Sequence, residues 1–133
     1  MGERMMHRLL LDTCAFIWLA TGDNKLSDRA RKAISAADCV FVSPISAWEI
    51  GQKHRQRKLK LPMPPQELFD AVVGRYALDI APLDTTIMFK ASLLPERHKD
   101  PADRFIIATA LLNGFTVVTA DRHFPEYGVN VIE

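Results

Sequence analysis

The chain has 133 residues, of which 48% are hydrophobic and 25% are charged, an ordinary balance for one globular domain with a sizeable core. Its 17 Lys and Arg residues and 16 Asp and Glu residues give a formal net charge of +1, so bulk charge predicts no polyanion partner and any nucleic-acid interface has to be a local patch. No apolar stretch reaches the length of a membrane span, and we expect a single cytoplasmic domain over residues 1–133 with no membrane partner.

The first half of the chain alternates short apolar runs with helical patterns. Residues 7–11 and 39–42 are apolar runs without polar alternation, as expected of strands that are buried on both faces of a parallel sheet. Between and after them, a Ser27 N-cap and apolar residues at helical spacing predict helices over residues 15–20, 27–37 and 45–57.

The second half continues the alternation after a proline-rich loop over residues 59–65. Pro82 places a weak strand over 78–83 near a sheet edge. A charged loop over 95–101 precedes a strongly apolar helix that ends at Gly114, a favourable residue after a helix. The remaining predicted elements are helices over 66–75, 84–94 and 103–113 and strands over 115–119 and 129–132.

Strands that alternate with helices imply right-handed crossovers and a parallel sheet with helices on both faces. We therefore predict the α/β fold class, with a mainly parallel sheet.

Several residues are expected in the core of this fold. Cys14 and Cys39 follow no metal-ligand spacing and are expected as buried, reduced thiols, as is usual in the cytosol. Five aromatic residues lie on apolar faces, which favours core packing over base stacking: Phe16, Trp18, Trp48, Phe105 and Phe115. An exposed Trp18 or Phe69 would instead serve a dimer or partner surface.

Four acidic residues stand at the ends of the predicted elements. Asp12 ends the first strand, Glu49 lies early in the helix after the second strand, and Asp121 follows the strand over 115–119. Because strand ends and the starts of the following helices share one edge of a parallel sheet, we expect these three to converge. Asp103 begins a helix that is entered from a loop, so its convergence follows less directly.

Each acid also has a purely structural interpretation. Asp12 suits a helix N-cap, and Ser46–Glu49 matches a capping box, in which Glu49 only satisfies a backbone donor. Asp103 lies at the favourable end of a helix dipole behind an Asp100 N-cap, and Asp121 suits a turn.

A cluster of such acids favours metal chemistry, because neighbouring carboxylates raise one another's pKa and cannot all stay ionised unaided. Mg²⁺ prefers oxygen ligands and is often held by a few carboxylates together with a substrate phosphate. Such a site activates water and stabilises the oxyanions of phosphodiester cleavage. The constellation therefore indicates metal-dependent hydrolysis of a phosphodiester.

The acids lie within four segments: LLLDT at 9–13, SPISAWEI at 43–50, DPADRFIIATA at 100–110 and VVTADRHF at 117–124. Together and in this order, the segments resemble the PIN-domain ribonucleases, and most closely the VapC-type toxins of bacterial and archaeal toxin–antitoxin pairs. The resemblance implies a flavodoxin-like, three-layer α/β/α sandwich and an endoribonuclease that depends on Mg²⁺ or Mn²⁺. It also implies a homodimer and a small antitoxin whose tail covers the acidic site.

Carried over residue by residue, the resemblance makes Asp12, Glu49, Asp103 and Asp121 the catalytic, metal-binding acids. The fourth position varies in the family, so Asp121 either binds the metal or assists without binding it. Two hydroxyls, of Thr13 and Thr119, lie near the same edge and orient a carboxylate or water, or simply cap helices, as Ser43 and Ser46 are expected to do. Arg104 either contacts phosphate or forms an ion pair within the acidic cluster.

The run of residues 52–60 is strongly basic and has two interpretations. It is either a solvated helix end whose cations complement the dipole, or a patch that binds RNA phosphates next to Glu49. On the second interpretation the RNA-binding residues are Lys53, Arg55, Arg57 and, beyond the run, Arg122.

Two other functions remain open at this point: a PIN nuclease that processes RNA without being a toxin, and an acidic pocket that binds or regulates without catalysis. Nucleotide-cofactor binding is disfavoured, because neither GxGxxG nor a Walker motif occurs in the sequence.

Overall fold

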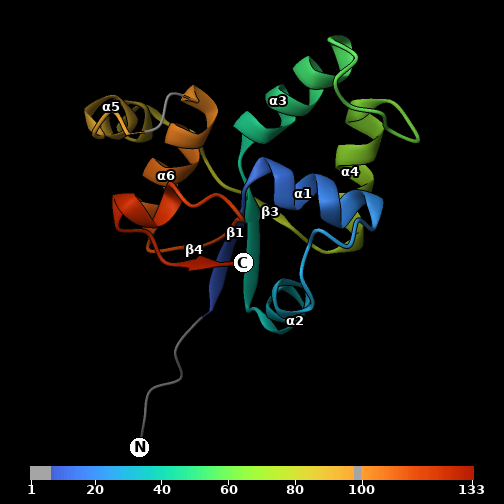
Figure 1. Ribbon diagram of the computed structural model, residues 1–133, viewed down its shortest axis with the longest axis horizontal. Helices are drawn as coiled ribbons and strands as arrows, with labels where there is room; N and C mark the ends of the chain where they lie inside the picture. The colour runs from blue at the N-terminus through green and yellow to red at the C-terminus, as the bar shows by residue number, and fades with distance from the viewer. Residues whose placement is uncertain (1–6, 98–99) are drawn as a thin grey trace, which may run out of the picture.

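The computed structural model describes residues 7–97 and 100–133, so His98 and Lys99 of the predicted charged loop lie outside the described residues. Five strands form one parallel sheet in the order β3-β2-β1-β4-β5, with β1 at its centre (Figure 1). The strands are β1 (Arg8–Leu11), β2 (Cys39–Val42), β3 (Asp79–Ile80), β4 (Thr116–Val118) and β5 (Val131–Ile132). The predicted α/β class and parallel sheet are confirmed.

The predicted helices all form, with ends that differ by a few residues. They are α1 (Thr13–Thr21), α2 (Asp28–Ala36), α3 (Pro44–Arg55), α4 (Pro65–Arg75), α5 (Thr85–Leu93) and α6 (Pro101–Asn113), and a short 3₁₀ helix η1 (Phe124–Tyr127) precedes β5. The expected caps Ser27 and Asp100 accept hydrogen bonds from backbone N–H groups of the first turn, and Gly114 ends α6 in the left-handed conformation.

The weak strand predicted over 78–83 is shorter than expected. Only Asp79 and Ile80 pair with β2, and they do so at the edge of the sheet. Ala81 N–H still donates to Val42 O at 2.9 Å, and the next residue, Pro82, has no N–H with which to continue the ladder.

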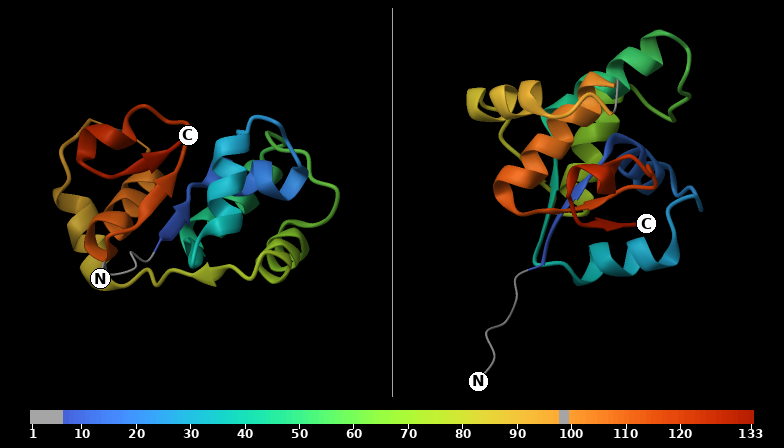
Figure 2. Two further views of the ribbon diagram at one scale, coloured as in Figure 1. Left: turned by 90° about the horizontal axis from the view of Figure 1, so that it is seen from below. Right: turned by 60° about the vertical axis from the view of Figure 1, so that its left-hand side comes forward.

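Side chains of the central strand alternate between two cores. Leu9 and Leu11 pack with residues of α1, α2, α3 and α4, whereas Leu10 packs with residues of α5 and α6. Figure 2 shows the corresponding layers, with α5 and α6 on one side of the sheet and the earlier helices on the other. The three-layer α/β/α arrangement is therefore confirmed. Within the described residues, none of the helices has the length and apolar character needed to cross a membrane.

The prediction of buried cysteines is wrong. Both thiols are free, but Cys14 is exposed and Cys39 is half-buried. Cys14 is the second residue of α1. Its side chain does not face the sheet but lines a cavity beyond the carboxyl end of the sheet.

The prediction of core aromatic residues holds for four of the five. Phe16 and Trp18 pack in the core beneath α1, and Phe105 and Phe115 pack in the core on the other side of the sheet. Trp48 is the exception, since its side chain lies on the surface.

Candidate active site

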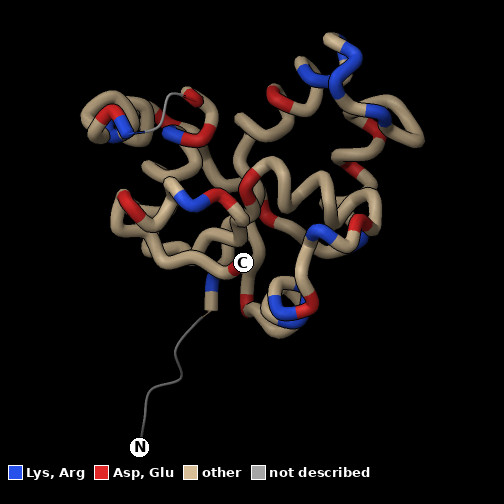
Figure 3. The backbone as a smooth tube through the Cα atoms, in the orientation of Figure 1, with Lys and Arg blue, Asp and Glu red and all other residues tan. Residues whose placement is uncertain are grey.

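A cavity of about 340 Å³ opens at the carboxyl edge of the sheet, and all four predicted acids line it. Asp12 comes from the end of β1, Glu49 from α3 and Asp103 from the first turn of α6, while Asp121 follows β4. Figure 3 shows several acidic segments near the end of the sheet where the central strands stop. The predicted convergence is confirmed, and it includes Asp103.

Asp12 is the predicted N-cap and also reaches the cavity. Its Oδ1 accepts a hydrogen bond of 2.7 Å from Ala15 N–H and so caps α1, while the carboxylate also lines the cavity. Burial raises the pKa of Asp12 to about 6, although hydrogen bonds from the Thr119 hydroxyl and Ala15 N–H work in the opposite direction. The nearby charges of Asp121 and Glu49 raise the pKa further.

Glu49 is held by a chain of hydroxyl groups. Thr13 Oγ1 donates to Glu49 Oε1, and Ser46 Oγ lies 2.9 Å from the same Thr13 oxygen. Because the single hydroxyl proton of Thr13 goes to Glu49, Ser46 is the donor to Thr13. Burial raises the pKa of Glu49, which the Thr13 hydrogen bond partly offsets.

The capping box predicted at Ser46–Glu49 is therefore wrong. Helix α3 starts earlier, at Pro44, and its N-cap is Ser43, whose Oγ accepts a hydrogen bond from Ile45 N–H at 3.1 Å. Proline suits the first position of a helix, which places Ser46 inside α3, fully buried. The spacing of Ser46 and Glu49, at i and i+3, could have indicated that both side chains lie on the same buried face of α3.

The pKa of Asp103 is raised further than that of Asp12. Burial raises the pKa of Asp103 to about 8, and the charges of Asp100, Glu49, Asp12 and Asp121 act in the same direction. The sequence predicts Asp100 only as a cap, and it accepts the expected hydrogen bond of 3.0 Å from Ala102 N–H, yet it also lines the cavity.

Asp121 forms the predicted turn and lines the cavity as well. Its N–H donates to Thr119 Oγ1 at 3.0 Å, and its Oδ1 accepts from His123 N–H at 2.9 Å. His123 Nδ1 lies 2.9 Å from the same carboxylate oxygen. Thr119 accepts from Asp121 N–H, so its hydroxyl proton is available to Asp12, and the predicted orienting role of this threonine fits the geometry.

Arg104 does not form the predicted ion pair within the acidic cluster, while its contact with phosphate stays a prediction. Its guanidinium donates to the carbonyl oxygens of Ala91, Leu94 and Pro95 at 2.8, 2.7 and 2.9 Å. The last carbonyls of a helix lack partners within it, and Arg104 satisfies those at the end of α5 instead of contacting the acidic cluster.

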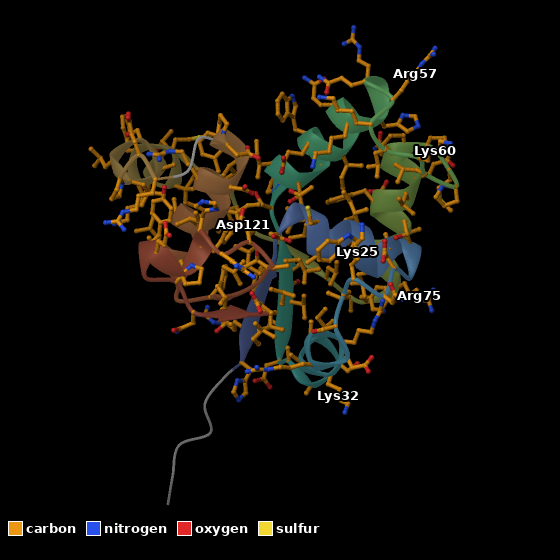
Figure 4. The ribbon with its side chains drawn as sticks, in the orientation of Figure 1. Lys25, Lys32, Arg57, Lys60, Arg75 and Asp121 are labelled. Carbon is orange, nitrogen blue, oxygen red and sulfur yellow. The ribbon has the colours of Figure 1, made fainter. Side chains whose placement is uncertain are left out.

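The basic run divides between two places. Lys53, one helical turn after Glu49, lines the acidic cavity itself. Arg55 and Arg57 line a separate hollow of about 670 Å³ with His54 and Lys60, at the outer end of α3, where Figure 4 labels Arg57 and Lys60. Arg122 is exposed next to Asp121.

The donor set suits a hard divalent cation. Mg²⁺ prefers oxygen ligands such as carboxylates. Because the ion keeps several of its waters, it needs only one or two carboxylates as direct ligands. Within residues 7–97 and 100–133, no three His, Cys, Asp or Glu side chains already stand in a metal-binding arrangement. The repulsion that raises the pKa of Asp12 and Asp103 is the kind that a bound cation relieves.

Comparison with known proteins agrees with this geometry. A family model described as PIN domain matches residues 9–130. The chain is 34% identical over 119 residues to the protein named ribonuclease VapC22 of Mycobacterium tuberculosis (strain ATCC 25618 / H37Rv), a match that covers 88% of this chain and 89% of that protein.

Solved structures share the fold at low identity. The VapBC2 structure from Rickettsia felis, bound to a DNA fragment from its promoter, superposes with a TM-score of 0.68 at 18% identity and covers 94% of this chain and 97% of that chain. A toxin–antitoxin complex from Klebsiella pneumoniae gives a TM-score of 0.66 at 20% identity and covers 94% of this chain and 96% of that chain.

Proposed function

Because the chain belongs to the PIN domain family, within its VapC-type ribonucleases, we propose that it is a metal-dependent endoribonuclease that acts as the toxin of a toxin–antitoxin pair. The observation that carries the proposal is the convergence of Asp12, Glu49, Asp103 and Asp121 on one cavity. These acids come from four separate parts of the chain, and the pKa values of Asp12 and Asp103 are raised as expected of a site built for a cation.

In this proposal Asp12 and Asp103 would hold Mg²⁺ or Mn²⁺, and Glu49 and Asp121 would be further ligands or would accept hydrogen bonds from water near the ion. The cation supplies an activated water and stabilises the oxyanions of phosphodiester cleavage. Thr13 and Thr119 keep Glu49 and Asp12 oriented through the hydroxyl contacts described above. Carboxylates that are already oriented lower the activation free energy, because less entropy is lost on reaching the reactive geometry.

The RNA is held through its phosphates. Lys53 carries a positive charge into the acidic cavity, Arg55 at the end of α3 and Arg57 just beyond it continue that charge, and Arg122 adds an exposed cation next to Asp121. Such contacts add affinity that depends on salt and not on sequence.

We propose a small antitoxin as the protein partner, together with a homodimer of this chain. Support for the antitoxin comes from the fold shared with the toxin–antitoxin complex from Klebsiella pneumoniae. A cytoplasmic location is part of the same proposal, and the two free thiols support it.

The test is cleavage of total RNA by protein freed of any co-purifying partner, with Mg²⁺, with Mn²⁺ and with EDTA. We expect cleavage that needs the metal and is lost in Asp12→Asn. Asparagine is as good an N-cap as aspartate, so this variant is expected to melt no lower than wild type. Asp79→Asn, at an exposed site on the sheet edge, is the matched control and should cleave normally.

Normal cleavage by Asp12→Asn would contradict the assignment of the cavity as the catalytic site. Absence of cleavage under any metal, together with calorimetry that detects no Mg²⁺ binding, would leave an acidic binding pocket instead of a nuclease.

A further inference from the structure

The side chain of Trp48 is exposed to solvent, although the sequence analysis predicts it in the core. Its side chain is 59% exposed, whereas its neighbours in α3, Ser46, Glu49 and Ile50, are buried. Tryptophan is highly buried on average in folded domains, and tryptophan is enriched at binding surfaces.

Trp48 directly precedes the cavity residue Glu49 in α3. Ile45, three residues earlier on the same face, packs with the core cluster of α5 and α6, so this face of α3 looks toward the α6 side. Glu49 and Lys53, on the neighbouring face, line the acidic cavity. Trp48 lies about 100° around the helix axis from Glu49, on the exposed side of α3 and outside the set of residues that line the cavity.

The continuation of this face is positively charged. Arg55 follows Trp48 by two helical turns, about 10 Å along the axis, and lines the basic hollow at the outer end of α3. The Lys and Arg residues of segment 50–66, which contains no acid, are Lys53, Arg55, Arg57, Lys58 and Lys60. Figure 3 shows these basic segments at the outer end of α3.

An exposed aromatic next to a track of cations is the arrangement that binds single-stranded nucleic acid, since bases stack on the ring while cations follow the backbone. We propose that Trp48 stacks on an unpaired base of the RNA, so that the enzyme accepts single-stranded segments and not duplex across its acidic cavity. This inference rests on the proposed ribonuclease function and adds to it one specificity-determining residue, Trp48.

The surroundings of Trp48 favour RNA over a protein partner. Other large exposed apolar side chains gather on α5, where Phe89 is 71% and Leu93 is 81% exposed. Trp48 instead shares its face with Gln52 and Arg55, whose polar groups suit phosphate and base edges better than an apolar protein surface.

The experiment measures binding of a fluorescein-labelled ten-nucleotide oligoadenylate and of the same strand in a duplex, in EDTA at about 50 mM salt, where phosphate contacts are strong. We expect wild type to prefer the single strand and Trp48→Ala to lose about tenfold in affinity for it, within the range measured for loss of base stacking. Trp48→Phe should retain most of the affinity. Phe89→Ala, which removes another exposed aromatic ring, should change neither Kd.

Fluorescence reports the stacking directly, because Trp18 and Trp48 are the two tryptophans of the chain. In Trp18→Phe the remaining indole is Trp48, and unlabelled oligoadenylate should quench it. In Trp48→Phe the remaining indole is Trp18, which borders the cavity but is packed against the core, so it should be quenched far less.

Three results would overturn the proposal: no binding of the oligonucleotide by wild type, an unchanged Kd in Trp48→Ala, or no quenching in Trp18→Phe. An unchanged Kd accompanied by dissociation of a dimer would assign Trp48 to a protein contact. The stacking measurement needs no metal, whereas the proposed function depends on metal-dependent cleavage by wild type. The two can therefore fail separately.

Discussion

At the level of single residues, Asp12 and Glu49 reach the cavity already oriented by neighbouring hydroxyl groups. Thr119 bonds Asp12, and Thr13 bonds Glu49 while it accepts from Ser46. Thr13, Ser46 and Thr119 are all buried, so water cannot replace these hydrogen bonds without entering the protein. Mutation of a side chain that orients a metal-binding residue in this way often lowers metal affinity or activity substantially.

The hydroxyl of Thr13 provides the sharpest test of this arrangement. Thr13→Val keeps the shape but removes the donor to Glu49 and the acceptor for Ser46, which costs about 1–3 kcal/mol for the groups left without partners. We expect a lower free energy of unfolding and a loss of about 10–100-fold in Mg²⁺ affinity or kcat, measured by denaturant titration and by cleavage at varied Mg²⁺. Thr13→Ser, which keeps the hydroxyl, should recover most of both; equal losses in the two variants would show that the methyl group and not the hydroxyl matters.

The raised pKa values of Asp12, about 6, and Asp103, about 8, predict how the metal-free protein responds to pH. A folded-state pKa above the ordinary value means that the folded protein binds more protons than the unfolded chain between about pH 4 and pH 8. This contribution to stability is complete below the ordinary pKa and is lost as the pH rises through the folded-state values of about 6 and about 8. In EDTA, Tm should therefore fall between about pH 5 and about pH 8.5.

Two controls isolate the acids in that experiment. Asp103→Asn should flatten the fall in Tm, whereas Asp79→Asn, at an exposed position, should leave it unchanged. Mg²⁺ added at about pH 8 should raise Tm of wild type and release protons, because the ion replaces protons on the carboxylates. A Tm that rises with pH in EDTA would contradict the assignment.

At the level of elements, the periodicity of the sequence predicts the helices and strands well, and it fails where a helix faces a functional cavity. In α3, Ile45 and Trp48 have the spacing of a core stripe, yet the buried face holds Ser46, Glu49 and Ile50. A polar face that is buried for function inverts the usual pattern. Conflicts between local pattern and global fold are expected at such sites, so the misplacement of Trp48 itself points to the site.

Arg104 shows a different limit of prediction. Its partners are backbone carbonyls at the end of α5, and backbone groups leave no residue signal in a sequence. The convergence of Asp12, Glu49 and Asp121 was predictable because strand ends and the starts of the following helices share an edge, whereas Asp103 was assigned to the site through the family resemblance. The hydrogen bonds of one long side chain depend on how α5 packs on α6 and were not predictable.

The position of Arg104 predicts a stability effect with little effect on chemistry. Arg104→Met removes charge-assisted hydrogen bonds to the last carbonyls of α5, and we expect the free energy of unfolding to fall by about 2 kcal/mol. The folded fraction should keep its kcat and its salt dependence of RNA binding. A variant with unchanged stability but weaker RNA binding would instead support the phosphate contact expected from sequence.

At the level of the whole molecule, a net charge of +1 hides a strong separation of charge. Acids line the cavity at the sheet edge, whereas cations extend along α3 and beyond it from Lys53 to Lys60. On the proposed function, an RNA strand that spans the cavity and the outer end of α3 would contact these cations, which would offset the repulsion between phosphate and carboxylate. Affinity for RNA should therefore depend steeply on salt although the protein is nearly neutral overall.

This separation predicts unequal effects from equal changes of charge. Replacing Lys53, Arg55 and Arg57 together by glutamine should weaken RNA binding and reduce the slope of log K against log salt by about 0.7 for each phosphate of a single strand that is no longer neutralised. The control replaces Lys25, Lys32 and Arg75, which are exposed and which Figure 4 places away from the outer end of α3. Both variants carry three fewer positive charges than wild type, so an effect of net charge would appear in both. A change of slope confined to the first variant would assign the RNA contact to the basic run at the end of α3. Equal slopes in the two variants would instead support the interpretation of this run as a solvated helix end.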